Sequence, residues 1–357
     1  MDVSSHDLFI CAASDFFNSH GLSYSQYLNV KSAESISPSF SNGYCIKRRL
    51  DCCEICRLFC SFFSSHTSID PFSISTIVST SGKNVFTVNC LDFMTAYSTS
   101  LLYGVIPCIR LNVEDERCSI EGHSTSCMQA FVLKYGVNFS SFFSVFELVN
   151  YFFSSLGIHA SRIHYSLSDY DGGDGYSGVR ISFNINNITV GSAMYYFMTP
   201  YSSSDNAMNF WFGVERICWA ITGVPYFQCI CTASGFLENK NKYFLEDRLR
   251  TMILFYMSEL RVGNKNAAYH LKKFMKDILP CGDAINFAFF VRYYYRFWSC
   301  IFSSNVSEYD VLSRLLNDYQ YLRALNYCNR YRKSNILKNL DRDEIDIFEY
   351  VIRTFAH

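Results

Sequence analysis

The pattern of hydrophobic and polar positions divides the chain into a mixed α/β part and a helical part. Between 83 and 200, short β-rich runs (VFTVNC, CIRLNV, VRISFNI, NITVGSAMYYFM) occur with one amphipathic helix at 141–156. Asn186 and Asn187 predict a hairpin turn between the last two runs. Beyond 244 the apolar spacing becomes helical. We therefore predict an α+β fold, an antiparallel sheet flanked by helices and followed by an all-helical domain.

Two helices are predicted before the β-rich part, at 6–19 and 49–65. In the second, LDCCEICRLFCSFFSSH, the cysteines 53, 56 and 60 recur at helical spacing on one face with Phe63. The C-x-x-C pair suggests zinc, but no second pair has the usual spacing, and ligands on successive turns of one helix rarely close a tetrahedral site. We expect reduced cysteines packed in the core and no metal held by them.

Composition and charge place the chain among globular proteins. Charged residues make up 18% and aromatic residues 17%, and the formal net charge is −1. The charge is uneven, with −7 over 1–238 and +6 over 239–357. A basic C-terminal third favours binding of a polyanion, and chance clustering on solvated helices is the alternative. Without a secretory signal, or the ~18 apolar residues of a membrane helix, we expect a cytoplasmic protein with no membrane partner.

Two arginines lie in motifs about a hundred residues apart. PCIRLN, at 107–112, carries Arg110, and FWFGVERICWAITG, at 210–223, carries Arg216 at the start of a predicted helix. In this order they resemble the second and third signature motifs of class II aminoacyl-tRNA synthetases. The resemblance implies that Arg110 holds the α-phosphate of ATP and Arg216 the departing pyrophosphate. A guanidinium suits both tasks because it is always charged and donates in a planar fork.

Further segments resemble the archaeal form of alanyl-tRNA synthetase in its catalytic and tRNA-recognition domains. The helix at 49–65, NVFTVNCLDF at 84–93, the second motif with its loop at 107–126, SDYDGGDGYSG at 168–178 and the segment 246–273 carry the likeness, which spans roughly 47–280. It implies a variable segment at 1–46, a catalytic domain at 47–243 and a helical tRNA-recognition-like domain at 244–357.

The resemblance also implies roles for individual residues, with ATP and Mg2+ as cofactors and an amino acid and the tRNA acceptor stem as partners. The expected ATP-binding residues are Arg110, Glu114, His123, Glu215 and Arg216, of which Arg110 and Arg216 are catalytic. The expected amino-acid pocket consists of Asp171, Asn209, Trp211 and Gly213. The expected tRNA-binding residues are Arg248, Arg250, Asn264, Lys265, Lys272 and Lys273, although Asn264 can equally be a plain turn residue.

The chain departs from the family pattern at the amino-acid pocket. Asn209 replaces an aspartate that accepts a charged hydrogen bond from the amino group of alanine, a contact worth about 1.5–3 kcal/mol. Trp211 replaces a glycine that lets the substrate approach closely. His123 follows Glu121 and Gly122 where the family has Gly-Arg-His, and Cys127-Met128 replaces Phe-Glu. We expect retained arginines, an altered pocket, and neither an editing domain nor the N-terminal cysteine knuckle.

Three functions remain open at this point. The first is ATP-dependent activation of an amino acid and its transfer to tRNA or a related acceptor. The second is a non-catalytic paralogue that binds tRNA or another protein, and the third is a structural protein that kept the fold. A protein partner or a homodimer fits any of them, and the sequence specifies neither the amino acid nor the acceptor.

Overall fold

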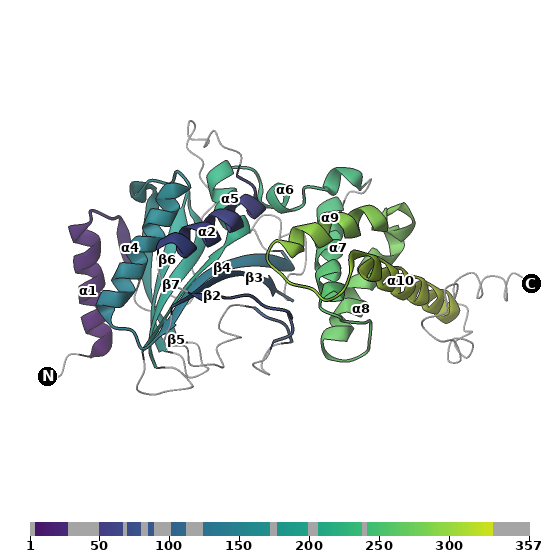
Figure 1. Ribbon diagram of the computed structural model, residues 1–357, viewed down its shortest axis with the longest axis horizontal. Helices are drawn as coiled ribbons and strands as arrows, with labels where there is room; N and C mark the ends of the chain where they lie inside the picture. Colours follow the sequence, from purple (N-terminus) through teal and green to yellow (C-terminus); the bar gives the residue numbers. More distant parts are fainter. Residues whose placement is uncertain are drawn as a thin grey trace, which may run out of the picture.

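The computed structural model describes residues 4–27, 50–66, 70–79, 85–88, 101–111, 124–171, 177–198, 206–237 and 241–330. These residues form one eight-stranded sheet with helices against one face, followed by a bundle of helices (Figure 1). The predicted α+β class is therefore confirmed. Two of the eight strands, β1 and β2, are short, pair in parallel and extend the edges of the predicted antiparallel sheet.

The strand order is β1-β5-β6-β7-β8-β4-β3-β2, with antiparallel pairing from β5 to β3. The strands are β1 Tyr24–Tyr27, β2 Asp70–Pro71, β3 Leu102–Ile109, β4 Ser126–Tyr135, β5 Ile163–Asp171, β6 Ser177–Ile185, β7 Ile188–Met198 and β8 Ala207–Gly213. The helices are α1 Ser5–Ser19, α2 Cys52–His66, α4 Phe139–Ser155, α5 Val214–Thr222, α6 Tyr226–Ile230, α7 Lys242–Met257, α8 Asn266–Ile278, α9 Phe287–Ser299 and α10 Glu308–Arg330.

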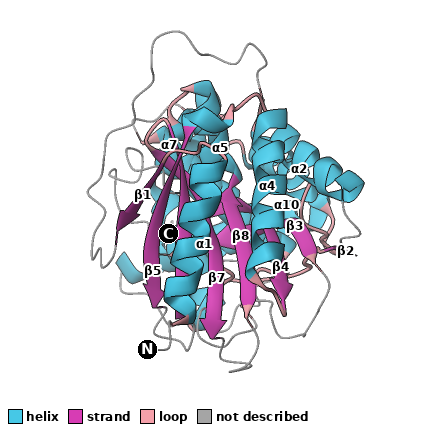
Figure 2. Cartoon of the chain, turned by 90° about the vertical axis from the view of Figure 1, so that its left-hand side faces the viewer, coloured by secondary structure: helices cyan, strands magenta, loops and turns pink. Residues whose placement is uncertain are grey.

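Helices α1, α2 and α4 cover the same face of the sheet (Figure 2). Helix α4 begins at the N-cap Asn138, whose side chain accepts a hydrogen bond from the Ser141 amide. Its aromatic side chains then pack on the strands: the ring centroids of Phe142 and Phe210 are 5.1 Å apart. Alternate residues of each strand point to this face, which forms the core of the α/β part.

The hairpin between β6 and β7 turns at the predicted pair. Asn186 and Asn187 have φ angles of 52° and 61°. Two consecutive left-handed residues make the turn whose twist matches the flanking strands, and asparagine tolerates that conformation better than most residues. The prediction of a hairpin here is confirmed.

The cysteine-rich helix α2 is confirmed, but its buried face differs from the predicted one. Cys56 is buried, and its thiol donates to the Met128 sulfur at 3.4 Å. Cys53 and Cys60 are only half-buried, so the prediction that all three lie in the core was wrong for these two. The stripe that faces the sheet is instead the one containing Cys52, Cys56, Phe59 and Phe63. The cysteines in the described part of the chain are free.

Helix α7 is the centre of the helical part. From Leu245 to Met257 every residue is buried, because α8, α9 and α10 pack around it and its first turns contact β4. Figure 1 shows this bundle beside the end of the sheet formed by β3 and β4.

Candidate active site

The face of the sheet opposite α4 carries polar side chains. Along 163–167 of β5 and 179–185 of β6 the residues that point toward α4 are buried and apolar, whereas those between them are polar and half-buried. The strand registers place a row of small and polar residues across this second face. We call it the polar face and define it by Ser166, Arg180, Ser182, Ser192, Asn209 and Trp211.

Three of the four expected pocket residues lie on the polar face. Asn209 is opposite Met194 of β7 and Leu133 of β4, and it is buried. Trp211 is opposite Ser192 and Phe131 and is half-buried. Gly213 ends the strand and is the N-cap of α5. The structure thus places Asn209, Trp211 and Gly213 in one line along β8.

Asp171 does not join them. It is exposed at the end of β5, where strand alternation directs its side chain to the same face as Asp169. Asp169 accepts a hydrogen bond from His6 of α1 at 2.7 Å, and α1 lies on the helix-covered face. The expectation that Asp171 lines the pocket with Asn209 was therefore wrong. Residues 172–176 of the same glycine-rich segment lie outside the described residues.

Arg110 and Arg216 lie near the same end of the polar face. The Arg110 amide donates to the Thr125 carbonyl at 2.8 Å, which continues the β3–β4 ladder one residue beyond β3. Arg110 therefore follows Cys108 on the polar face. Strand β3, which precedes Arg110, is second from the edge of the sheet, between β4 and β2.

Arg216 reaches the same end from the first turn of α5. A Cβ atom built on Gly213 would lie 3.3 Å from the Arg216 Cγ, so the arginine side chain passes over the glycine on the polar face. Its Nε donates to the Thr189 carbonyl at 2.6 Å. A glycine at 213 thus leaves the space that the Arg216 side chain occupies.

The two guanidinium groups share their surroundings. Burial lowers the pKa of Arg216, and the positive charge of Arg110 lowers it further. The nearby Cys127 raises the pKa of Arg110 against the effect of burial. In turn, the Cys127 pKa is lowered by a hydrogen bond with Cys108 and by the Arg110 charge. Two cations near each other at half-buried positions create a positive potential.

Glu215 does not belong to this cluster. Its side chain is fully buried, and Oε1 accepts hydrogen bonds from the Arg250 Nη2 at 2.7 Å and the Met128 amide at 2.8 Å. The expectation that Glu215 contacts ATP was wrong, because its first oxygen is already engaged inside the protein. Consecutive residues of a helix point about 100° apart, so Glu215 and Arg216 face different neighbours.

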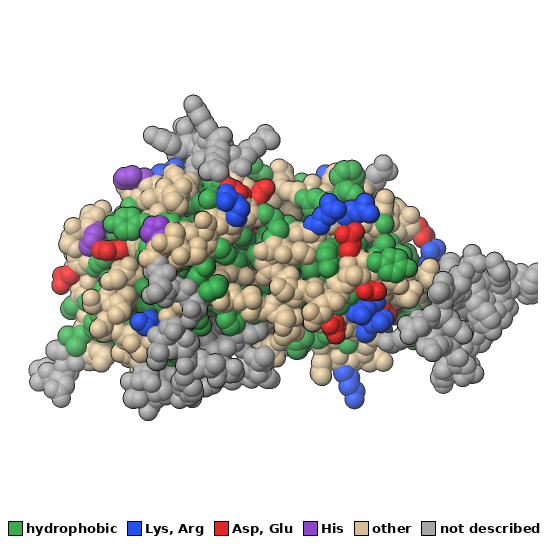
Figure 3. Space-filling view, in the orientation of Figure 1, with side chains coloured by type: hydrophobic (Ala, Val, Ile, Leu, Met, Phe, Trp, Pro, Cys, Tyr) green, Lys and Arg blue, Asp and Glu red, His purple; other side chains and the backbone are tan. Residues whose placement is uncertain are grey.

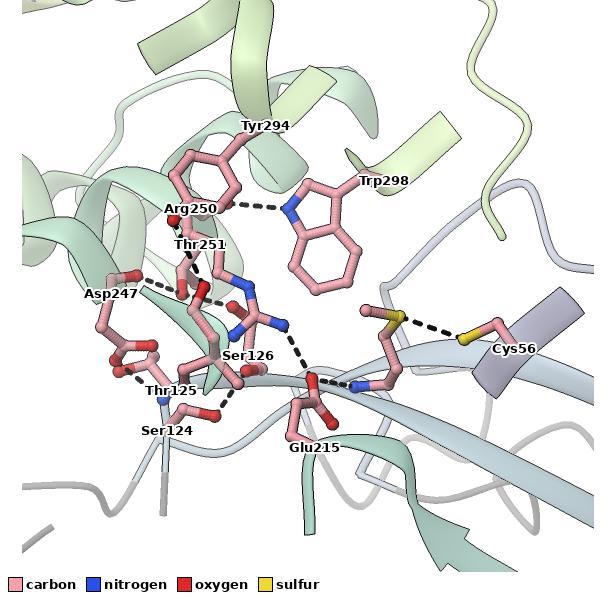
Figure 4. Close-up of polar contacts among 12 residues, drawn as sticks. Cys56, Ser124, Thr125, Ser126, Glu215, Asp247, Arg250, Thr251, Tyr294 and Trp298 are labelled. Atoms are coloured by element: carbon pink, nitrogen blue, oxygen red, sulfur yellow. Dashed lines mark hydrogen bonds and ion pairs between the residues drawn. The ribbon is translucent and has the colours of Figure 1, made fainter. Parts of the chain in front are cut away.

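Arg248 and Arg250 were expected to bind tRNA, and the structure contradicts both expectations. Arg250 is fully buried, pairs with Glu215, and lies over the Trp298 ring with 4.8 Å to the centroid. Arg248 is 6% exposed, contacts Asp277 at 3.2 Å and donates to the Thr125 hydroxyl. Both cations stabilise the junction between the sheet and the helical part. Figure 4 shows Arg250 there, beside Glu215 and Trp298.

The same junction buries two carboxylates of α7. Asp247 accepts a hydrogen bond from the Thr125 amide at 2.9 Å. Glu246 accepts from the Ala233 amide at 2.8 Å and from the Tyr294 hydroxyl. Burial raises the pKa of Glu246 to about 7. The charged run EDRLR thus binds distant partners inside the protein, and the α7 N-terminal half adjoins the Arg110 end of the polar face.

The other expected tRNA-binding residues lie near the start of α8 and along it. Lys265 and Lys273 are exposed, and Lys272 is half-buried. The Lys272 Nζ donates to the Asn264 Oδ1 at 2.6 Å, so this exposed asparagine has its side-chain oxygen directed at a lysine. No observation on these residues tests contact with RNA.

Glu114 and His123 lie outside the described residues, as does most of the first motif at 84–93. Among the residues that the structure describes, no group of three histidine, cysteine, aspartate or glutamate side chains could hold a metal ion. Within the same residues, no helix is both long enough and apolar enough to cross a membrane.

The sequence did not reveal Ser192 and Arg180 of the polar face, nor Tyr226 of α6. Ser192 is buried and Arg180 half-buried, and Tyr226 is a buried neighbour of Arg216 whose hydroxyl lies 2.9 Å from the Ser124 hydroxyl. Burial raises the pKa of Tyr226 well above its usual range. Alternation of polar and apolar residues in VRISFNI could have revealed Arg180, whereas Tyr226 gives no signal in the sequence.

The chain is similar to solved structures of two aminoacyl-tRNA synthetases. For a pyrrolysyl-tRNA synthetase of Desulfitobacterium hafniense the similarity covers 50% of this chain and 72% of that one, with 10% identity and a TM-score of 0.39. For the aspartyl-tRNA synthetase of Entamoeba histolytica it covers 48% and 54%, with 10% identity and a TM-score of 0.35. No family model and no curated protein matches the sequence. The alanyl type stays a prediction.

Proposed function

We propose that the polar face binds ATP and an amino acid and forms an aminoacyl adenylate, with tRNA or a related RNA as the acceptor. The observation that carries the proposal is that Arg110, which follows β3, and Arg216 of α5 lie near the same end of this face. The charge of one guanidinium lowers the pKa of the other. A polyphosphate relieves this repulsion by binding between them.

In the proposed reaction an α-carboxylate oxygen attacks the α-phosphorus of ATP. The bond between the α- and β-phosphates breaks, and pyrophosphate leaves. Arg110 neutralises charge on the α-phosphate and Arg216 on the pyrophosphate, as the synthetase resemblance implies. Fixed cations at the positions where charge develops lower the barrier because they need no reorganisation.

Asn209 and Trp211 form the centre of the amino-acid pocket in this proposal. Asn209 offers an uncharged acceptor to the substrate amine, and the Trp211 indole occupies the space beside it. Both features make the pocket different from one built for alanine. Mg2+ remains part of the proposal as the resemblance implies it: among the residues that the structure describes, Glu215 is bound to Arg250 and no group of acidic side chains could hold a metal ion.

Calorimetric titration with ATP tests the phosphate end of the site. Arg110→Ala and Arg216→Ala should each weaken binding by about 1.5–3 kcal/mol, roughly 10- to 150-fold. Arg57→Ala is the matched control, because Arg57 is an exposed arginine of α2 that pairs with Glu54. Equal ATP affinity in the wild type and both site variants contradicts the proposal.

A second function, RNA binding without catalysis, is favoured by an exposed aromatic surface. Phe236 is 66% exposed and its ring is tilted against that of Phe289, with ring centroids 4.4 Å apart, and Tyr293 stacks on Phe289. Helix α9, which carries Phe289 and Tyr293, also exposes Arg292 and Arg296. Figure 3 shows basic and hydrophobic side chains together over the helical part. Aromatic rings with arginines stack bases and neutralise phosphates.

Fluorescence anisotropy with labelled tRNA distinguishes the two functions. Phe236→Ala and Arg296→Ala should weaken RNA binding several-fold in either case. The non-catalytic function is favoured if tRNA binds while millimolar ATP does not. If the wild type forms an adenylate, RNA binding without catalysis does not explain the protein's function.

A further inference from the structure

The hairpin between β6 and β7 holds the Arg216 side chain at its Nε. Strand β7 begins at Ile188, before its first pair with β8, which joins Gly191 to Phe212. Residues 188–190 therefore extend beyond the last pair with β8. Within this extension the Thr189 carbonyl accepts a hydrogen bond from the Arg216 Nε at 2.6 Å.

The bond at Nε determines how the rest of the Arg216 guanidinium is oriented. The group is planar and its N–H donors form a rigid fork. Nε is the nitrogen nearest to the chain, so a bond there fixes the plane of the group and the directions of its Nη donors. A group that stabilises developing charge has to be held in its productive geometry by such neighbouring bonds. The Thr189 carbonyl is therefore placed to set the geometry of Arg216.

Thr189 is in turn held by hydrogen bonds that cross the neighbouring strands. Its hydroxyl donates to the Asn184 Oδ1 of β6 at 2.7 Å. The Asn184 Nδ2 donates to the Ser166 hydroxyl of β5 at 3.0 Å and to the His164 carbonyl at 3.2 Å. Hydrogen bonds thus run from β5 through β6 to Thr189 of β7, whose carbonyl accepts the bond from Arg216.

The pairing of β6 with β7 is irregular at the same place. Phe183 is opposite Gly191, but Asn184 is opposite Thr189, so β7 has one extra residue, Val190. Such a bulge bends the strand and redirects the residues beside it, and bulges recur next to active sites. Here the bulge separates the part of β7 that pairs with β8 from the residue that holds Arg216.

The hairpin also contacts α5 one turn beyond Arg216. The Asn186 Nδ2 donates to the Ala220 carbonyl at 2.9 Å. Positions 216 and 220 are neighbours on one face of a helix. The turn and the start of β7 therefore bind the same side of α5, which keeps the Thr189 carbonyl aligned with the arginine.

We propose that Thr189 is a positioning residue for Arg216. Its hydroxyl bond to Asn184 sets the hairpin backbone, and its carbonyl then holds the Arg216 Nε so that the guanidinium faces the departing pyrophosphate. This inference rests on the proposed function. Thr189 contacts no reacting atom and acts only through Arg216. A donor held in advance stabilises charge that develops in the transition state, so its loss should lower kcat more than it raises the KM for ATP.

Pyrophosphate exchange with two variants of Thr189 tests this role. Thr189 is exposed, so both variants should fold. Thr189→Val keeps the shape of the side chain but removes the hydroxyl, and it should lower kcat about three- to tenfold. Thr189→Ser retains the hydroxyl and should restore most of the activity. In an Arg216→Ala background Thr189→Val should have no further effect, because the two residues act as a unit.

Thr222→Val is the matched control for the loss of a threonine hydroxyl. Thr222 ends α5, and its hydroxyl donates to the Cys218 carbonyl within that helix at 2.8 Å. This variant perturbs α5 away from Arg216 and should retain the wild-type kcat. A wild-type kcat in Thr189→Val, or the same loss in Thr189→Val and Thr222→Val, overturns the inference.

A second readout needs no activity. NMR identifies the Arg216 Nε–H as the side-chain signal that Arg216→Ala lacks. Its exchange with water should be about three- to tenfold faster in Thr189→Val than in the wild type or Thr189→Ser. Equal exchange rates in the wild type and Thr189→Val overturn the inference.

The two readouts distinguish this inference from the proposed function. If Thr189→Val accelerates the exchange of the Nε–H in a protein that neither binds ATP nor exchanges pyrophosphate, the hold on Arg216 is supported and the proposed function is rejected. If the wild type exchanges pyrophosphate and Thr189→Val does so with equal kcat, the proposed function stands and the positioning role is rejected.

Discussion

Arg250 and Glu215 form a fully buried ion pair, with Nη2 and Oε1 2.7 Å apart. Arg250 belongs to α7 and Glu215 to α5, directly before Arg216. Burial opposes the charge of Arg250, but Glu215 outweighs that effect and the arginine pKa is raised. The pair therefore joins the helical part to the helix that carries one of the two polar-face arginines.

Removing one partner of this pair should be severely destabilising. Arg250→Met leaves the Glu215 carboxylate buried without its cation, and breaking such a pair costs about 3–5 kcal/mol. Urea denaturation measures the free energy of unfolding. Arg57→Met is the control, because its exposed pair with Glu54 should contribute less than about 1 kcal/mol.

The double variant Glu215→Leu, Arg250→Met should recover part of that loss, because apolar side chains carry no desolvation cost. If the loss of unfolding free energy in the double variant equals the sum of the losses in the two single variants, Glu215 and Arg250 are not energetically coupled, which would contradict this account.

Glu246 should make stability depend on pH. Its folded-state pKa of about 7 lies above the unfolded value of 4.5, so the folded protein holds the proton more tightly. The contribution of Glu246 to the free energy of unfolding is complete below about pH 4.5 and is lost as the pH rises through about 7. Its upper limit is about 3 kcal/mol. The free energy of unfolding should therefore fall between about pH 5 and pH 8.

Glu246→Gln should flatten this dependence, because the amide keeps an acceptor for the Ala233 amide and cannot ionise. Denaturation curves across that pH range provide the measurement. An unchanged slope in the variant would show that Glu246 is not the titrating group.

The hairpin turn predicts opposite effects of two substitutions at Asn187, whose φ is 61°. Asn187→Ala places a Cβ in the left-handed region and should cost about 1–2 kcal/mol. Asn187→Gly removes the steric conflict and should be neutral or stabilising, as expected for this turn type. Thermal unfolding measures both, and equal destabilisation by alanine and glycine would contradict the turn geometry.

Local patterns predicted most of the fold. The alternation in VRISFNI, the asparagine pair and the apolar periodicity of α2 and α4 each reflect short-range geometry, so they were readable without tertiary information. The edge strands β1 and β2 were missed because they are short and pair with distant segments.

The site was predicted less completely because its residues depend on distant partners. Arg248 and Arg250 carry the same charge as the exposed lysines of α8, and only the fold shows that carboxylates and aromatic rings surround them. Glu215 and Arg216 are adjacent in sequence, but the turn of α5 sends one into the core and the other across Gly213. The side of a helix that faces the core is a tertiary property, and here it separates a structural residue from a candidate catalytic one.

The most direct test of the central claim is amino-acid-dependent exchange of pyrophosphate into ATP, measured with each of the standard amino acids in turn. The account predicts exchange with at least one amino acid, loss of about tenfold or more in Arg110→Ala and Arg216→Ala, and normal exchange in Arg57→Ala. No exchange with any amino acid, in a folded protein that binds ATP, would contradict amino-acid activation on the polar face.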